Sequence, residues 1–239
     1  MSVIVPCEHR AVTLVRSGRP STRPGGPVKI YADSARLDVV LPLLERGLLA
    51  GVTTNPTILH RDGFASADRA MLHTRFAEAG AQEIFLQAVG SDEASMRADA
   101  EALAALGPDV VVKVPATSVG FPVGAALAAQ GTPVLVTAVY SVGQAAVAAS
   151  IGAAYIAPYL GRLADSVPDP LDLVGRMDAA LDGSGTRTLL ASVRSVEAAE
   201  RAVTAGIRHL TADVPVIVGL MSHDVSDASA AEFERVAAL

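Results

Sequence analysis

The sequence predicts an α/β fold: a single closed (β/α)8 barrel (TIM barrel) at residues 28–239, with an N-terminal extension at 1–27 and a C-terminal helix. Two observations predict it. Short apolar segments alternate with helical patterns eight times, which is typical of a parallel sheet. The length of 239 residues fits one barrel. An open doubly wound sheet is the alternative, but neither a Gly-x-Gly-x-x-Gly after the first strand nor a P-loop pattern is present.

The extension at residues 1–27 is expected to be mobile or to lie over a neighbouring surface. Residues 12–15 could form one short strand, because they alternate apolar residues with a threonine. Residues 17–27 are rich in Gly, Pro and Ser, which favours turns.

The first half of the barrel is expected to contain four strands and four helices. Runs rich in Val, Ile or Leu predict strands at 28–32, 51–53, 83–89 and 110–117. Apolar residues at helical spacing predict helices at 34–48, with Ser34 as the N-cap, at 65–79, at 92–106 after a Ser91 cap, and at 119–130. The last of these is Ala-rich and therefore expected to be mostly buried.

The second half repeats the alternation. Apolar runs predict strands at 133–139, 154–160 and 187–193, and a weaker one at 209–212. Helices are expected at 142–151, from about 170 to about 183, and at 196–205, where Gly206 ends the helix. Short helical segments at 214–221 and 228–239 finish the chain.

Composition excludes several classes of function. Hydrophobic residues make up 51% and aromatic residues 4%, so a sizeable core is expected from Ala, Val and Leu. The net charge of -6 argues against nucleic-acid binding, and no apolar run reaches the roughly 18 residues of a membrane span. The single Cys7 suits a reducing, cytoplasmic location. The five histidines are scattered, so no metal site is expected.

Lys113 is the most informative residue, because it interrupts the Val-rich strand at 110–117. Only one other lysine, Lys29, occurs in the chain. A buried lysine loses proton affinity, and its neutral amine is a nucleophile that forms Schiff bases with ketones. The strand therefore predicts iminium chemistry at Lys113.

Polar residues at the carboxyl ends of the other strands are expected to lie with Lys113 at the same end of the barrel. They are Asp33, Thr53, Asn55, Gln87, Thr117, Thr137, Tyr140, Tyr159, Arg162, Ser192 and Arg194. Asp33 and Tyr159 are suited to proton transfer, Thr137 and Gln87 to holding a water, and Asn55 to binding substrate hydroxyls. Arg162, Ser192 and Arg194 are suited to an anion site.

Each of these residues also has a purely structural interpretation. Lys113 could form a buried ion pair with Asp33, or Asp33 could cap the first helix. Tyr159 could be a core aromatic, and Thr137 a core hydroxyl with its hydrogen bond satisfied. The two arginines could be solvated surface charges, and Asn55-Pro56 is a common turn pair.

The sequence resembles the transaldolase and fructose-6-phosphate aldolase family of class I aldolases, from about residue 28 to about 206. Its motifs are GVTTNPT at 51–57, VVKVP at 111–115, TAVYS at 137–141 with Gln144-Ala145, YIAPYLGRL at 155–163, and ASVR at 191–194.

The resemblance implies a (β/α)8 barrel without a cofactor, with Lys113 as the Schiff-base lysine and Asp33 as acid/base and hydroxyl anchor. It implies phosphate contacts from Arg162, Ser192 and Arg194, and therefore a sugar or sugar phosphate substrate. It also implies a homo-oligomer, a pentamer or decamer, in which the C-terminal helix reaches a neighbour.

Three positions favour the fructose-6-phosphate aldolase type. Transaldolases of the family tend to have Glu, Ser and Phe where this chain has Gln87, Ala157 and Tyr159. A phenol can exchange a proton where Phe cannot. We therefore expect cleavage and formation of a C–C bond between a dihydroxyacetone-like donor and an aldehyde. A transaldolase and a non-catalytic phosphosugar-binding barrel are the alternatives.

The chain departs from the family at four places: the extension at 1–27, the loop at 164–170, the missing Leu-Pro pair at 209–213, and the missing C-terminal Trp.

Overall fold

The computed structural model describes residues 26–239, which form a closed barrel of eight parallel strands in sequence order, with β1 paired to β8. This confirms the predicted (β/α)8 barrel. The strands are β1 (Lys29–Ala32), β2 (Gly51–Thr53), β3 (Glu83–Gln87), β4 (Val110–Pro115), β5 (Val134–Val139), β6 (Tyr155–Pro158), β7 (Arg187–Val193) and β8 (His209–Ala212). The extension's expected strand at 12–15, most of its linker and Cys7 lie outside the described residues.

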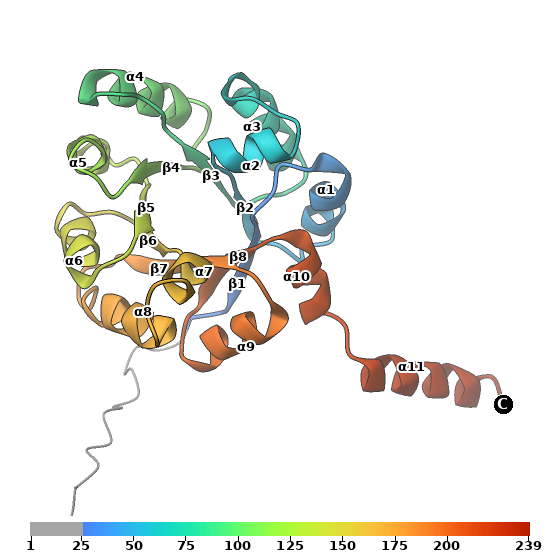
Figure 1. The fold of residues 1–239 in the computed structure, drawn as a ribbon. Coiled ribbons are helices and arrows are strands. Elements are labelled where there is room, and N and C mark those ends of the chain that lie inside the picture. The colour runs from blue at the N-terminus through green and yellow to red at the C-terminus, as the bar shows by residue number, and fades with distance from the viewer. Residues whose placement is uncertain (1–25) are drawn as a thin grey trace, which may run out of the picture.

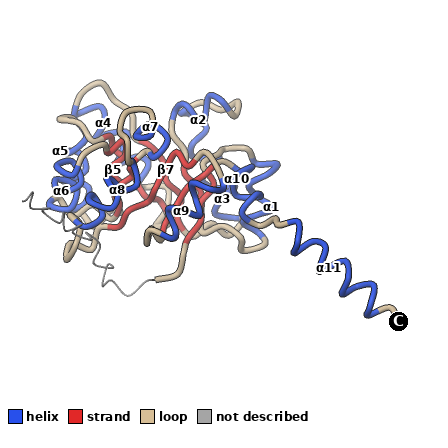
Figure 2. The backbone as a smooth tube through the Cα atoms, turned by 60° about the horizontal axis from the view of Figure 1, so that its bottom comes forward, coloured by secondary structure: helices blue, strands red, loops and turns tan. Residues whose placement is uncertain are grey.

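Helices surround the barrel on the outside, as Figure 1 shows. They are α1 (Leu37–Glu45), α2 (Pro56–Arg61), α3 (Arg69–Glu78), α4 (Glu93–Ala104), α5 (Gly120–Ala129), α6 (Val142–Ser150), α7 (Leu160–Ala164), α8 (Pro170–Ala179), α9 (Val196–Thr204), α10 (Val214–Leu220) and α11 (Asp224–Ala237). A 3-10 turn, Ser66–Asp68, precedes α3. The last helix, α11, extends away from the barrel in both Figure 1 and Figure 2.

Two short helices were not expected from the sequence. Asn55-Pro56 opens α2 instead of forming a simple turn, because the Asn55 side chain accepts a hydrogen bond from the Ile58 amide at 3.0 Å and Pro occupies the first helical position. The expected sixth strand ends early: β6 stops at Pro158, Tyr159 makes only an isolated bridge to Ala191, and Leu160 begins α7.

Two predicted helix caps are wrong. Ser34 does not cap α1, which begins at Leu37; its hydroxyl donates to Asp62 at 2.9 Å. Asp92, rather than Ser91, caps α4, because its carboxylate accepts from the Ser95 amide at 2.8 Å. The C-terminal helix begins at Asp224, four residues before the predicted start.

The barrel has two apolar layers, and their alternation along β4 places Lys113. Val112 and Val114 pack in the core between strands and helices, whereas Val111 packs in the core inside the barrel. Successive side chains of a strand point to opposite faces, so Lys113 points inward on the same face as Val111. One strand therefore supplies packing on one face and an amine inside the barrel.

Polar side chains cluster at the amino-terminal end of the barrel. The Glu83 carboxylate accepts hydrogen bonds from Tyr31 Oη at 2.6 Å, Tyr155 Oη at 2.5 Å and Lys29 Nζ at 3.1 Å. Burial raises the pKa of Glu83, but these three donors outweigh burial and hold the pKa below its ordinary value. The cluster joins β1, β3 and β6 below the apolar interior.

Candidate active site

Lys113 is almost completely buried, with 4% of its surface exposed. Its Nζ donates a hydrogen bond to the Thr54 carbonyl oxygen at 2.7 Å. Burial lowers the pKa of Lys113 to about 8, and the Asp33 carboxylate opposes that shift. Among the described residues no close nitrogen–oxygen contact joins Lys113 to Asp33, although the two charges interact across the cavity.

Asp33 follows β1, and its carboxylate accepts a hydrogen bond from Thr53 Oγ1 at 2.6 Å. It does not cap α1, whose N-cap position is Arg36. Burial raises the pKa of Asp33, while Lys113 and the Thr53 hydrogen bond lower it; on balance the pKa is raised. A carboxyl group with a raised pKa is suited to taking up and returning protons near neutral pH.

Tyr159 lies across the cavity from Asp33, and its phenol shares a hydrogen bond with Thr137 Oγ1 at 2.8 Å. Burial raises the pKa of Tyr159, so the phenol stays protonated at neutral pH and can donate. The Tyr140 ring packs edge-on at 6.0 Å, and the Arg162 guanidinium lies 5.6 Å from the Tyr159 ring centroid. These neighbours hold the ring in place.

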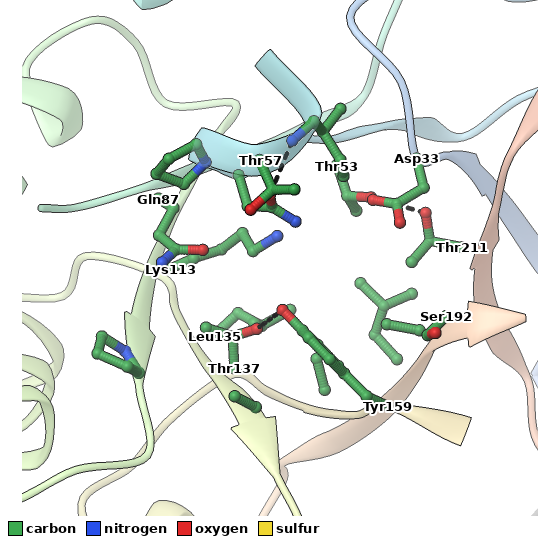
Figure 3. Close-up of a pocket in the computed structure, with 18 of the residues that line it drawn as sticks. Asp33, Thr53, Thr57, Gln87, Lys113, Leu135, Thr137, Tyr159, Ser192 and Thr211 are labelled. Atoms are coloured by element: carbon green, nitrogen blue, oxygen red, sulfur yellow. Dashed lines mark hydrogen bonds between the residues drawn. The ribbon is translucent and has the colours of Figure 1, made fainter. Parts of the chain in front are cut away.

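These side chains surround one cavity of about 400 Å³ at the carboxyl ends of the strands. Figure 3 shows Lys113, Asp33 and Tyr159 entering it from three different directions. Ten of the predicted residues line it: Asp33, Thr53, Asn55, Gln87, Lys113, Thr137, Ala157, Tyr159, Arg162 and Ser192. Thr117 and Tyr140, also expected at this end of the barrel, do not line it: Thr117 accepts a hydrogen bond from the Gly120 amide, and Tyr140 packs against the Tyr159 ring. Asn55 lines the cavity while its side chain also caps α2.

Arg194, a predicted phosphate contact, also does not line this cavity. It borders an adjacent cavity of about 370 Å³ and is 3.5 Å from Asp165 at the surface. Ser192 lines both cavities, and a Cβ at Gly161 would collide with Ser192 Oγ and Arg194 Nε. The glycine therefore lets both side chains approach the backbone of α7 closely.

Two cavity residues have unusual backbone geometry. Ala138 and Ser192 have φ angles of 58° and 57°, in the left-handed region that residues other than glycine seldom adopt. Both lie where the barrel register shifts, between Thr137 and Val139 and between Leu190 and Val193. Such strain is common at functional sites.

Sequence reasoning missed several residues of the site. Thr57, Ala138, Leu135, Leu189 and Thr211 also line the main cavity. Thr211 had a usable signal, because it is a polar residue near the carboxyl end of the weak eighth strand, and that end opens into the same cavity.

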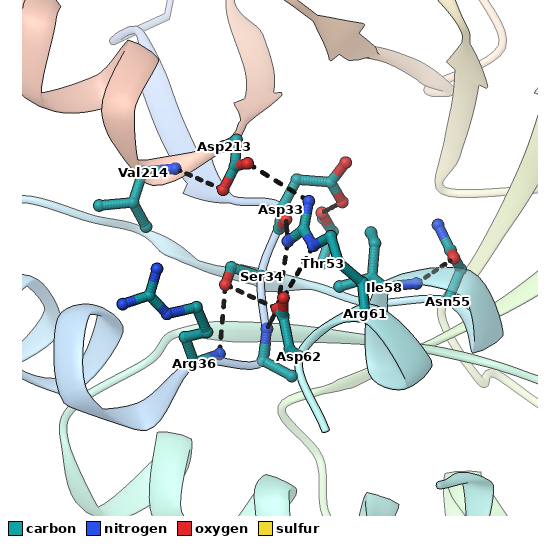
Figure 4. A network of polar contacts seen from close by, with 11 residues as sticks. Asp33, Ser34, Arg36, Thr53, Asn55, Ile58, Arg61, Asp62, Asp213 and Val214 are labelled. Atoms are coloured by element: carbon teal, nitrogen blue, oxygen red, sulfur yellow. Dashed lines mark hydrogen bonds and ion pairs between the residues drawn. The ribbon is translucent and has the colours of Figure 1, made fainter. Parts of the chain in front are cut away.

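Arg61 was also missed, because it belongs to the unexpected helix α2. It donates to the Asp33 carbonyl oxygen at 3.2 Å and pairs with Asp62 at 2.7 Å and Asp213 at 3.3 Å (Figure 4). Asp62 in turn accepts from Ser34 and the Ala35 amide. This network fixes the backbone that carries Asp33.

The residues described include no group of three or more side chains suited to holding a metal ion. Within residues 26–239, no helix has the length and apolar character needed to cross a membrane.

The barrel and its cavity define a class of protein. A lysine with a depressed pKa, facing a carboxyl group and a phenol at the carboxyl ends of a (β/α)8 barrel, is the arrangement of an enzyme that forms Schiff bases with carbonyl substrates. The family model described as Transaldolase/Fructose-6-phosphate aldolase matches residues 30–238, and this chain belongs to that family of class I aldolases.

Relatives of known name agree with this assignment. A "Probable transaldolase" of Parabacteroides distasonis is 34% identical over 209 residues, covering 86% of this chain and 96% of the relative. A "Probable transaldolase" of Caulobacter sp. (strain K31) is 34% identical over 210 residues, covering 86% and 94%. The chain is therefore a transaldolase-like enzyme.

Among solved structures, a "putative dihydrodipicolinate synthase family protein" from Coccidioides immitis matches with a TM-score of 0.57 at 12% identity, over 78% of this chain and 67% of the other. Identity this low shows a shared fold only.

Proposed function

We propose that this chain is a Schiff-base aldolase of the fructose-6-phosphate aldolase type. It joins or cleaves a dihydroxyacetone-like donor and an aldehyde that bears a phosphate. The observation that supports this most is the pairing of the Tyr159 phenol with Thr137 in the same cavity as Lys113. Gln87 and Ala157 line the same cavity. An aldolase that releases its donor does not need a carboxylate at the position of Gln87 to relay protons.

The first step forms the iminium. The neutral Lys113 amine attacks the ketone carbon, a proton moves to the oxygen, and loss of water gives the iminium cation. Asp33 is the group that takes up and returns these protons, since it lines the same cavity as Lys113 and burial raises its pKa.

The second step breaks the C–C bond between the α and β carbons of the iminium. The bonding electrons move toward the iminium nitrogen and leave an enamine, while the hydroxyl on the departing β carbon gives its proton to the Asp33 carboxylate and that carbon becomes an aldehyde. Tyr159 supplies a proton, directly or through a water held with Thr137 and Gln87, to the enamine carbon. Addition of water across the resulting iminium then frees the donor and returns the Lys113 amine.

The phosphate of the substrate is expected at the side of the cavity formed by Arg162 and Ser192. Arginine matches a phosphate with two parallel hydrogen bonds. Arg194 joins this site from the adjacent cavity, against the small Gly161.

Two experiments test the proposal. Borohydride reduction in the presence of fructose 6-phosphate should trap an adduct that maps to Lys113; no adduct, or one on Lys29, would contradict the mechanism. A non-catalytic sugar-binding barrel would also trap no adduct.

Transaldolase activity is the second candidate, because the relatives described above carry that name. Fructose 6-phosphate alone should release free dihydroxyacetone. Turnover that requires added erythrose 4-phosphate would show a transaldolase instead.

A homo-oligomer, pentameric or decameric, is part of the proposal. Helix α11 extends from the barrel with apolar side chains exposed, including Val225 and Phe233, the latter 70% exposed. Such a helix face is buried when it packs against a second copy. A cytoplasmic location stays a prediction.

A further inference from the structure

A pair of buried hydroxyls lies behind Asp33, and only one of them belongs to the predicted site. Thr53 is on β2 and Thr211 is on β8, the two strands that flank β1 in the barrel. Thr211 Oγ1 is 2.7 Å from Thr53 Oγ1, which is 2.6 Å from Asp33 Oδ1. Thr211 is 2% exposed and lines the cavity (Figure 3).

Each hydroxyl of this pair has a single proton, and this limits which oxygen donates and which accepts in each hydrogen bond. Thr53 has one hydroxyl proton and two oxygens within reach, one on Asp33 and one on Thr211. Thr211 can donate to Thr53 at 2.7 Å or to the Tyr31 carbonyl oxygen at 3.3 Å. The shorter contact favours donation to Thr53, which directs the proton of Thr53 toward the carboxylate.

We propose that Thr211 is a positioning residue for the acid/base step: by donating to Thr53, it holds the Thr53 hydroxyl as a donor to the Asp33 carboxylate. The inference rests on the proposed function, since it assumes that Asp33 exchanges protons with the substrate. Hydrogen bonds in series polarise one another, so the outer hydroxyl strengthens the bond to the charged carboxylate.

Thr211 acts on a carboxyl group that other groups also influence. Lys113 and Arg61 favour the carboxylate form of Asp33, whereas burial and the nearby Asp213 disfavour it. Asp33 in turn acts on Tyr159 across the cavity. Because Thr211 is uncharged, its replacement changes none of these charges and tests the hydroxyl chain alone.

The variant Thr211→Val removes the hydroxyl and keeps the branched shape. We expect the pKa of Asp33 to rise by roughly a few tenths of a unit, because the Thr53 hydrogen bond to the carboxylate loses the roughly 10–30% strengthening that the outer hydroxyl gives it. The pH profile of kcat for cleavage of fructose 6-phosphate reports on the enzyme with substrate bound. In that state Lys113 is held as an iminium, so its own titration does not enter the profile. The acidic limb of the kcat profile should therefore move to higher pH by that amount.

Two further variants separate the hydroxyl from the methyl group and from general disturbance. Thr211→Ser keeps the hydroxyl and should restore the wild-type limb. Thr186→Val is the matched control, because Thr186 is equally buried but donates to the Ala153 carbonyl oxygen, away from the cavity. It should leave the limb in place. If Thr211→Val does not fold, Thr211→Ala replaces it with the same expected shift.

The outcomes distinguish this inference from the function beneath it. If wild-type protein traps no borohydride adduct on Lys113, the proposed function fails and the inference with it. If wild-type and Thr211→Val both trap the adduct and their acidic limbs coincide, the function stands and the role of Thr211 is refuted. That role is equally refuted if Thr186→Val moves the limb as far as Thr211→Val does.

Discussion

Replacing Lys113 by Met should make the protein more stable at neutral pH while abolishing Schiff-base formation. Lys113 is buried and its pKa is lowered to about 8 from an ordinary value of 10.5. Folding therefore opposes the ammonium form, so below pH 8 the protonated lysine destabilises the fold. Met has a similar volume and no charge to desolvate.

The magnitude follows from the pKa difference. A shift from 10.5 to about 8 corresponds to about 3 kcal/mol of destabilisation, fully present below pH 8 and absent above pH 10.5. Met also leaves the Thr54 carbonyl oxygen without the donor now 2.7 Å away, at a cost of about 1–2 kcal/mol. The variant should be about 1–2 kcal/mol more stable at pH 7 and should lose that advantage between pH 8 and 10.5.

Urea unfolding at several pH values between 7 and 10.5 measures this difference. Lys29→Met is the control, because Lys29 forms a partly buried ion pair with Glu83 and its loss should lower stability instead. A Lys113→Met protein that is less stable than wild type at pH 7, or whose difference does not change with pH, would refute the reasoning. Borohydride should trap no adduct on it.

Three other changes probe other parts of the molecule. Tyr159→Phe should lower dihydroxyacetone release from fructose 6-phosphate by about 10²–10³-fold, because it removes the phenol that donates protons; an unchanged rate would exclude that role. Glu83→Leu should lower the free energy of unfolding by about 3 kcal/mol, since it removes the acceptor of three hydrogen bonds; thermal or urea unfolding measures this, and a wild-type midpoint would contradict it. Phe233→Glu should leave the circular dichroism of the barrel unchanged and lower the mass seen by sedimentation; an unaltered mass would show that α11 is not the contact.

Several features of the candidate site could not be predicted from the sequence. Arg194 was grouped with Arg162 because both follow neighbouring strands, yet it borders a separate cavity. The backbone at Ser192 turns into the left-handed region, and this changes the direction of the chain just before Arg194. A strand-based assignment assumes regular alternation of side chains, which fails at such a residue.

The sequence alone determined the barrel, the approximate place of every strand, and the buried lysine. This information is local: a run of β-branched residues predicts a strand, and one lysine within it already implies a depressed pKa. Only the tertiary structure decided which groups that lysine and its neighbours touch. Lys113 meets Thr54, 59 positions away, and Thr53 meets Thr211, 158 positions away. Those contacts depend on the register of a closed sheet, which no short segment of the chain specifies.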